Sequence, residues 1–298
     1  MELLDTFRSA PWFFIGTAGV FGLAVGSFLN VVIHRLPKMM ETDWRAQCLD
    51  FLHPEQAAAP VASEKTTVQP RYNLVVPRSA CPLCGHKVTA IENIPVLSYL
   101  ALRGKCSKCH APIGVRYPLV ELLTGVLTGF LAWHFGVSWQ ALFAIIFLWA
   151  LIALTFIDAD TTLLPDDITL PLLWLGLLSN VAGTFTTLQA AVIGAVAGYL
   201  ALWSVYWAFK LITGKEGMGY GDFKLLAALG AWLGWQMLPL VILLSALVGT
   251  IVGVAGIVLQ GREKGAKLPF GPYLAAAGLI AIIWGVPLNA WYLGRLPG

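Results

Sequence analysis

The chain has 298 residues, of which 58% are hydrophobic and only 12% are charged, and its mean hydropathy is +0.75. Because charged residues make up roughly 25% of an average soluble domain, this composition excludes an ordinary water-soluble protein and indicates a polytopic membrane protein. The formal net charge is a modest +3, and eleven of the 19 Lys and Arg residues lie within residues 35–116. We interpret such clusters as determinants of membrane topology, and we expect the lipid bilayer, and no nucleic acid, as a partner.

The amino terminus predicts a retained helix and not a cleaved signal peptide, because Glu2 and Asp5 precede Arg8 where a signal peptide would begin with basic residues. Apolar runs long enough to cross a bilayer of about 30 Å predict roughly eight transmembrane helices. Their approximate ranges are 11–33, 117–135, 139–157, 168–182, 188–209, 222–235, 240–259 and 270–292. The sixth is short for a spanning helix, and we expect it to be tilted, kinked near Pro239 or partly sunk beside a cavity. Small residues at four-residue spacing predict close helix packing at Gly194, Gly198, Gly249 and Gly253.

The number of crossings also predicts the topology. If the polar block 35–116 is cytoplasmic, then the segments 158–167, 210–220 and 260–267 are cytoplasmic as well. With Lys224, at the start of the predicted sixth helix, 17 of the 19 basic residues lie on that side. This distribution satisfies the positive-inside rule. The predicted parts are a first transmembrane helix at 1–34, a cytoplasmic domain at 35–116 and a seven-helix membrane core at 117–298.

The polar block contains two CxxC pairs separated by 21 residues, formed by Cys81, Cys84, Cys106 and Cys109. Two such pairs at ribbon-like spacing are typical of a tetrahedral zinc site in which each pair lies in a tight turn, and Gly85 and Gly104 would ease those turns. Four thiolates leave no coordination position open for water. We therefore expect a structural zinc ion in a small ribbon-like domain held against the membrane face.

Other interpretations of the cysteines stay open but are weaker. Disulfides are disfavoured because the basic balance places this block in a reducing compartment. The CxxCH pattern of haem attachment, at 106–110, would need the outer face and would leave the other pair unexplained, and a dithiol redox role would leave four thiolates without their metal. His86 and His110 are alternative ligands, but no HExxH pair supports a zinc protease, and Cys48 is interpreted as a simple thiol.

Two acidic segments interrupt the apolar sequence. Asp222 ends a GxGD sequence that begins at Gly219, and residues 225–259 beyond it contain no charge, so this acid lies near a membrane boundary, where ionisable groups are usually functional. Asp158 directly follows another apolar run, where a carboxylate meets the unfavourable negative pole of its helix. The neighbouring acids are interpreted as solvated loop charges or, for Asp166, as a helix cap, and they are Asp160, Asp166 and Asp167.

We predict that Asp158 and Asp222 meet at the cytoplasmic membrane face. Two facing carboxylates in a partly desolvated site do not both ionise easily and therefore share a proton. The ionised member can take a proton from water while the protonated member donates to a peptide carbonyl, which is how a dyad hydrolyses a peptide bond. Gly219 and Gly221 would let an extended substrate backbone approach closely, and Lys224 lies near enough to influence the charge balance.

Across nearly its whole length the chain resembles the type IV prepilin peptidase family. The resemblance rests on the two CxxC pairs and on five longer motifs. These motifs are GSFLNVVIHRLP at 26–37, NIPVLSYLALRGKC at 93–106, RYPLVELLTG at 116–125, IDADTTLLPDDITLP at 157–171 and GYGDFKLLAALGAWLGW at 219–235. Residues 39–69 match the family least and look like a variable insertion.

This resemblance implies a bifunctional enzyme of the bacterial inner membrane, with Asp158 and Asp222 as the catalytic aspartates of an aspartic-type endopeptidase. The substrates would be type IV prepilins or type II secretion pseudopilins, whose basic leader stays in the cytoplasm and is cleaved after a glycine. The new amino-terminal residue, usually phenylalanine, would then be methylated from S-adenosylmethionine. The four cysteines suit a bifunctional member, and no residue can be assigned to the methyl donor from spacing.

Two other classes of protein compete with this interpretation. A non-enzymatic membrane assembly or scaffold subunit would use the zinc domain to dock partners, and it would leave every prepilin uncleaved. A proton-coupled transporter also places acids among membrane helices. The acids of this chain, however, gather at one membrane face instead of crossing the bilayer.

Overall fold

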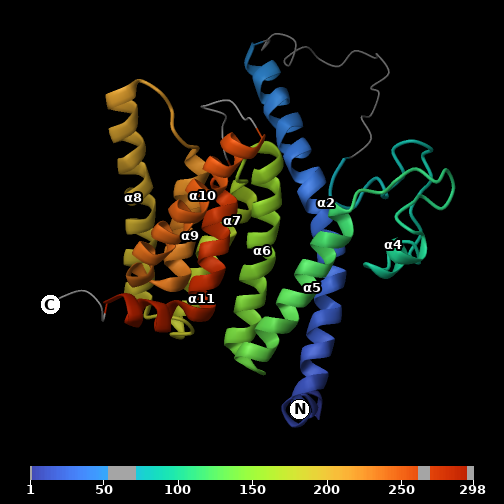
Figure 1. Ribbon diagram of the computed structural model, residues 1–298, viewed down its shortest axis with the longest axis horizontal. Coiled ribbons are helices and arrows are strands. Elements are labelled where there is room, and N and C mark those ends of the chain that lie inside the picture. Colours follow the sequence, from blue (N-terminus) through green and yellow to red (C-terminus); the bar gives the residue numbers. More distant parts are fainter. Residues whose placement is uncertain (1, 53–71, 261–268, 294–298) are drawn as a thin grey trace.

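The computed structural model describes residues 2–52, 72–260 and 269–293, and this part of the chain is predominantly helical (Figure 1). Two isolated antiparallel β-bridges, Ala80 with Lys87 and Lys105 with Pro112, lie in the polar block. The helices are α1 (Glu2–Ser9), α2 (Pro11–Leu52), α4 (Leu97–Ala101), α5 (Arg116–Phe135), α6 (Trp139–Thr161), α7 (Asp166–Val181), α8 (Leu188–Thr213), α9 (Tyr220–Leu233), the 3-10 helix η1 (Trp235–Met237), α10 (Leu238–Gln260) and α11 (Gly271–Leu293).

Six of these helices, α2, α5, α6, α8, α10 and α11, are long and apolar enough to cross a membrane. The predicted class of a polytopic helical membrane protein is therefore confirmed. Each of the eight predicted ranges coincides with a helix, but α7 and α9 have only 16 and 14 residues. At a rise of about 1.5 Å per residue, these two are shorter than the hydrocarbon core of a bilayer.

The helices form two groups joined by α6 (Figure 1). On one side, α2 packs closely along α5, and the small cysteine-containing lobe with α4 lies beside them. On the other side are α7 to α11, where α9 packs against both α7 and α8 and α10 packs against α11. Helix α6 contacts members of both groups, namely α2, α5, α7 and α11. It therefore connects α2 and α5, beside which the cysteine-containing lobe lies, to the rest of the bundle.

Helix α9 is the most enclosed helix of the bundle, which explains how a short helix can be stable there. From Asp222 to Leu233 every residue except Lys224 is buried. The carbonyl oxygens of Ala231 and Trp232 at its end accept hydrogen bonds from the Asn180 side-chain amide, at 2.9 and 3.1 Å. Because its terminal polar groups are satisfied inside the protein, α9 does not need to reach the aqueous phase on both sides.

Small residues let α8 approach α9, as predicted for Gly194 and Gly198. A side-chain Cβ atom added to Gly198 would lie 2.6 Å from the carbonyl oxygen of Leu226. Gly194 lies directly against Gly230, so that a Cβ atom on either would overlap the other's backbone. This close contact removes one whole side of α9 from lipid and water.

Helix α2 is longer than the predicted first transmembrane helix, which ended near residue 33. It continues without a break through Arg35 and Pro37 to Leu52. Beyond the apolar part, Glu41 and Arg45 form an ion pair of 2.6 Å at the (i, i+4) spacing, and this pairing favours continued helix. Part of the predicted variable insertion, residues 39–52, thus belongs to α2, and residues 53–71 lie outside the described part of the chain.

Candidate active site and metal centre

The structure buries Asp158 and Asp222 at the same end of the helix bundle. Asp158 lies in the last turn of α6 and is 4% exposed, whereas Asp222 lies in the first turn of α9 and is 7% exposed. The two carboxyl groups are near enough for the charge of Asp158 to act on Asp222. Among the described residues, neither has a Lys, Arg or His nitrogen within ion-pair distance.

Asp158 is held by a helix that sequence reasoning did not connect with it. Its Oδ2 atom accepts a hydrogen bond of 2.9 Å from the backbone N–H of Gly271, the first residue of α11. The unfavourable pole at the end of α6 is thereby offset, because the amino-terminal end of α11 carries the opposite partial charge. The position of Asp158 at a helix end thus has a physical explanation.

Asp222 has the opposite relation to its own helix. It is the third residue of α9 after the N-cap Gly219, where an acidic side chain can reach back to the N-cap backbone N–H. The backbone of Gly219 lies close enough to the Asp222 carboxyl group to act on its charge. Each buried carboxyl group therefore lies beside the backbone of a glycine at the start of a helix.

The other acids of the segment 158–167 have different surroundings. Asp160 is exposed and pairs with Arg116 at 2.6 Å, and Asp166 pairs with Lys224 at 2.7 Å. Asp166 is the first residue of α7 and makes no capping bond, so the cap considered for it from the sequence is replaced by this ion pair. Asp167, in the same turn, is exposed. Burial therefore distinguishes Asp158 from its three neighbours.

The two glycines before Asp222 differ in what lies beside them. A Cβ atom on Gly219 would meet nothing closer than 4.0 Å, and one of its two neighbours there is Asp222 Oδ2. The corresponding atom on Gly221 would lie 2.7 Å from the Cβ atom of Leu164, in the loop between α6 and α7. Only Gly219 thus leaves open space beside the acid, while the space beside Gly221 is filled by Leu164.

The four predicted cysteines come together in the polar lobe. Their sulfur atoms all lie within 4.8 Å of one another, with Cys81 and Cys109 3.7 Å apart and Cys84 and Cys106 3.9 Å apart. All four are free thiols in the structure. A tetrahedron with metal–sulfur bonds of about 2.3 Å has edges of about 3.8 Å, so these cysteines could hold a metal ion of that kind.

Each CxxC pair lies in a turn of the same design. The N–H of Gly85 donates to the Cys81 carbonyl at 2.9 Å, and the N–H of His110 donates to the Cys106 carbonyl at 3.0 Å. Both residues have positive φ, of 68° and 56°, and Gly85 adopts this conformation without the steric cost of a side chain. The predicted turn glycine Gly104 also has a φ of 68°. The local backbone of the two turns therefore agrees with a ribbon-like metal site.

The electrostatics of the turns favour a thiolate at one cysteine of each pair, whereas at Cys109 the neighbouring thiols outweigh the Ala111 N–H and raise the pKa to about 12. The backbone N–H groups of Cys84 and Leu83 point at the Cys81 sulfur and lower the pKa of that thiol to about 6. The N–H groups of Cys109 and Lys108 lower the pKa of Cys106 in the same way. Because metals bind the thiolate form, the lowered pKa values of Cys81 and Cys106 favour cation binding at one cysteine of each turn.

The alternative ligand His86 is engaged elsewhere. Its Nε2 atom lies 3.1 Å from both oxygens of Glu92, which also accepts hydrogen bonds from the Ser107 hydroxyl and the Thr89 N–H. The Ser107 hydroxyl, the Thr89 N–H and His86 together hold the pKa of Glu92 near 2. Glu92 thus ties the two cysteine turns together, and neither His86 nor His110 belongs to the four-residue metal-ligand cluster in the described chain.

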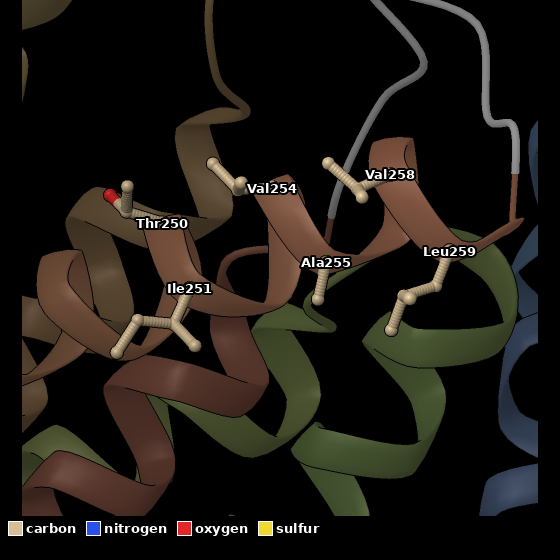
Figure 2. Close-up of a pocket in the computed structure, with 6 residues that line it drawn as sticks. All are labelled: Thr250, Ile251, Val254, Ala255, Val258 and Leu259. Carbon is tan, nitrogen blue, oxygen red and sulfur yellow. The ribbon is translucent and has the colours of Figure 1, made fainter.

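A hollow of about 500 Å³ lies along α10, away from both of these sites in the sequence (Figure 2). Its six lining residues are Thr250, Ile251, Val254, Ala255, Val258 and Leu259. None of them is an acid, a base or a thiol, and Val258 and Leu259 are 73% and 81% exposed. Such an apolar helix face suits contact with lipid chains, and we assign it no chemistry.

Taken together, the fold and these residues define a class: a multi-pass helical membrane protein with two buried aspartates at one end of its bundle and a lobe with a four-cysteine cluster.

Residues 145–254 match the model of the type IV leader peptidase family, and residues 20–135 match the bacterial peptidase A24 N-terminal domain. The prepilin leader peptidase/N-methyltransferase of Pseudomonas aeruginosa is 57% identical over 98% of both chains. The enzyme of the same name from Aeromonas hydrophila is 56% identical over 98% of both chains. The one from Legionella pneumophila is 46% identical over 95% of this chain and 96% of its own. No solved structure matches. The chain belongs to the type IV leader peptidase family.

Proposed function

We propose that this chain is an aspartic-type membrane endopeptidase and N-methyltransferase, which cleaves the leader peptide of type IV prepilins and pseudopilins and then methylates the new amino terminus. The relatives that cover nearly the whole chain carry the name prepilin leader peptidase/N-methyltransferase. One structural observation supports the peptidase activity. Asp158 and Asp222 are both buried, the charge of Asp158 acts on Asp222, and neither has a cationic partner among the described residues.

In the proposed reaction the two aspartates share one proton. The ionised carboxylate accepts a proton from the attacking water, while the protonated carboxyl group donates its proton to the scissile carbonyl oxygen. When the tetrahedral intermediate collapses, the C–N bond breaks and the leaving amine receives a proton from the dyad. The site is buried, so these charges are screened less than they would be in water. Gly219, beside Asp222, is the proposed point of approach for the substrate backbone.

The site is proposed to face the cytoplasm from the bacterial inner membrane. The distribution of 17 of the 19 basic residues supports this orientation. In this arrangement all eight predicted helices take part in the membrane fold, with 1–34 as the first, 35–116 as a cytoplasmic domain and 117–298 as the seven-helix core. A prepilin whose leader is cytoplasmic and whose apolar segment lies in the bilayer would then present its junction at the depth of the two aspartates.

The metal is proposed to be a structural zinc ion. Its ligands would be the sulfur atoms of Cys81, Cys84, Cys106 and Cys109, whose spacing suits a tetrahedral ion. Four thiolates leave no open position for water, so the ion would hold the two turns together and take no part in hydrolysis. The polar lobe contributes too little apolar core to fold readily without such a link.

Elemental analysis of the purified protein tests the metal. We expect one zinc per wild-type chain and none after Cys81→Ser or Cys106→Ser, while Cys48→Ser, which changes the cysteine outside the cluster, keeps the metal. Loss of the ion should make the lobe sensitive to proteolysis and should impair methylation more than cleavage. A wild-type protein that is fully active and contains no zinc would contradict the proposal.

The methyl donor is proposed to be S-adenosylmethionine, which would supply the methyl group to the amine that cleavage exposes. The sequence contains no glycine-rich loop of the dinucleotide-binding kind, and we assign no described residue to the donor. The proposal for this half of the activity rests on the family and on the name of the relatives.

One assay tests both activities. Purified protein is incubated with a prepilin peptide that spans the junction, with and without S-adenosylmethionine, and the products are read by mass spectrometry. We expect a cleaved peptide in both cases and a further 14 Da, the mass of one added CH₂ unit, only with the donor. An intact peptide under every condition, with co-purified assembly proteins, would favour the scaffold alternative instead.

A further inference from the structure

The first residue of α11 contacts the candidate dyad although it lies far from it in the sequence. Gly271 and Asp158 are 113 positions apart, and their hydrogen bond of 2.9 Å is buried. Gly271 also lies beyond both segments that match the family models, which end at residues 135 and 254. On the premise that Asp158 is catalytic, as proposed above, we propose that Gly271 is a positioning residue that holds this carboxylate in its reactive orientation.

The backbone N–H of Gly271 is free to take this role because of its place in the helix. The first N–H groups of an α-helix have no carbonyl partner within the helix, so they bond to water, to side chains or to ligands. In α11 the first of these groups is directed at Asp158 Oδ2. The contact fixes one oxygen of the carboxylate and leaves the other, Oδ1, to face substrate, water or the second aspartate.

The position also requires a residue without a side chain. A Cβ atom on Gly271 would lie 2.7 Å from Asp158 Oδ2 and 3.1 Å from its Cγ atom. These distances are shorter than carbon atoms normally approach such groups, so any larger residue must displace the carboxylate or the start of α11. The same Cβ atom would lie 3.1 Å from Leu164 Cδ2, which closes the third side of this space.

Leu164 connects the surroundings of the two acids. It is the loop residue that contacts both the position beside Gly221, in the GxGD sequence, and the position beside Gly271. Gly221 of α9 and Gly271 of α11 therefore leave room between them for the Leu164 side chain. At this point the end of α6 and the starts of α9 and α11 lie close together. The orientation of Asp158 thus depends on the start of α11 as well as on its own helix.

The substitution Gly271→Ala tests the proposal by kinetics. A displacement of the carboxylate by about 1 Å should lower kcat for leader cleavage about 100-fold and leave KM unchanged, because the residue does not bind the substrate. Methylation of a peptide that is already cleaved provides an internal reference and should keep its wild-type rate. The matched control is Gly285→Ala on the same helix, where the added atom meets Met237 Sδ at 3.1 Å.

Three outcomes are distinguished by this design. If Gly271→Ala cleaves with the wild-type kcat, the inference is wrong, and the proposed function is untouched. If the wild type itself cleaves no prepilin peptide, the proposed function is wrong. If adding Leu164→Ala restores the kcat of Gly271→Ala, the defect arises from the crowded leucine and not from Asp158, which also overturns the inference.

Amide hydrogen exchange tests the same contact without changing Gly271, should Gly271→Ala fail to fold. The Gly271 amide has no partner within α11, so its protection in the wild type reports the bond to Asp158. We expect slow exchange in the wild type and at least about tenfold faster exchange in Asp158→Ala, because this substitution removes the acceptor of the hydrogen bond. Equal exchange rates in the two proteins would overturn the inference.

Discussion

Glycines at the candidate site have different physical roles, which their surroundings separate. Gly271 has no room for a side chain because Asp158 fills that space, and Gly221 has none because Leu164 fills it. Gly219 is different, since it is exposed and its missing side chain leaves open space next to Asp222. Of the three, Gly219 is the one at which a substrate backbone could approach the acid directly.

The variant Gly219→Ala should therefore weaken substrate use without unfolding the protein. The added methyl group meets no protein atom closer than 4.0 Å, but it occupies the space in which a peptide would lie. We expect KM for the prepilin peptide to rise about tenfold, which corresponds to about 1.4 kcal/mol of lost binding, with an unchanged melting temperature. The control Gly16→Ala, in open space on α2, should change neither quantity. An unaltered KM for Gly219→Ala would exclude this glycine from the path of the substrate.

At this scale the sequence predicted the acids but not what holds them. Asp158 and Asp222 were found because each is an acid at the edge of an apolar run, and such residues are conspicuous in a chain with so few charges. Gly271 and Leu164 carry no such signal, because glycine and leucine are common in membrane helices and their loops. The hydrogen bond that joins Gly271 to Asp158 spans 113 positions, and only the folded chain reveals it.

Among the helices, α9 is held in the centre of the bundle by its close packing against α8. Gly194 and Gly230 are in backbone contact, and Gly198 approaches the carbonyl oxygen of Leu226. The far end of α9 is anchored by Trp232, whose indole N–H donates to the Leu172 carbonyl oxygen at 2.8 Å. The start of α9, and with it Asp222, is therefore fixed by contacts along the whole length of the helix.

The substitution Gly194→Leu should separate α8 from α9 and destabilise the bundle. Its side chain would overlap the backbone of Gly230, and inserting extra methylene groups into a packed core typically costs about 1–3 kcal/mol. Thermal unfolding in detergent should show a lower melting temperature than the wild type, and cleavage should fall with it. Gly16→Leu, on an open face of α2, serves as the control. A melting temperature equal to that of the control would contradict the packing described for α8 and α9.

The sequence predicts a helix well where an apolar run defines it, and less well where polar side-chain pairs stabilise it. The apolar ranges of α5 to α11 were recognisable because a bilayer demands continuous hydrophobic sequence. The extension of α2 to Leu52 was missed because its outer part is polar and is stabilised by local pairs such as Glu41 with Arg45. The two cysteine turns were predicted in detail, since the CxxC spacing itself specifies them.

At the scale of the whole molecule, the proposed orientation in the membrane places both the two aspartates and the cysteine-containing lobe on the cytoplasmic side. Reporters that are active only outside the cytoplasm test this orientation when inserted at single turns of the full chain. We expect activity at the turns near Gly136 and Gly183 and none near Gly214, because the last of these lies between the basic residues Lys210 and Lys215. The reverse pattern would place both aspartates on the wrong side of the membrane for a cytoplasmic leader.

The two groups of helices suggest a division of labour within this orientation. The cysteine lobe lies beside α2 and α5, whereas Asp222 belongs to α9 in the other group, beyond α6 (Figure 1). Asp158 is carried by α6, the helix that contacts both groups. Changes to the dyad should therefore affect cleavage selectively, and this selectivity can be measured within one protein.

The most direct test of the account replaces each aspartate separately and follows both activities by mass spectrometry. Asp158→Asn and Asp222→Asn should each lower leader cleavage by about 10²- to 10⁴-fold, because each removes one half of the acid–base pair, while methylation of a pre-cleaved peptide persists. Asp160→Asn and Asp166→Asn, which remove only exposed ion pairs, should cleave at close to the wild-type rate. Wild-type cleavage by either Asp158→Asn or Asp222→Asn would contradict the central claim that these two carboxylates act together.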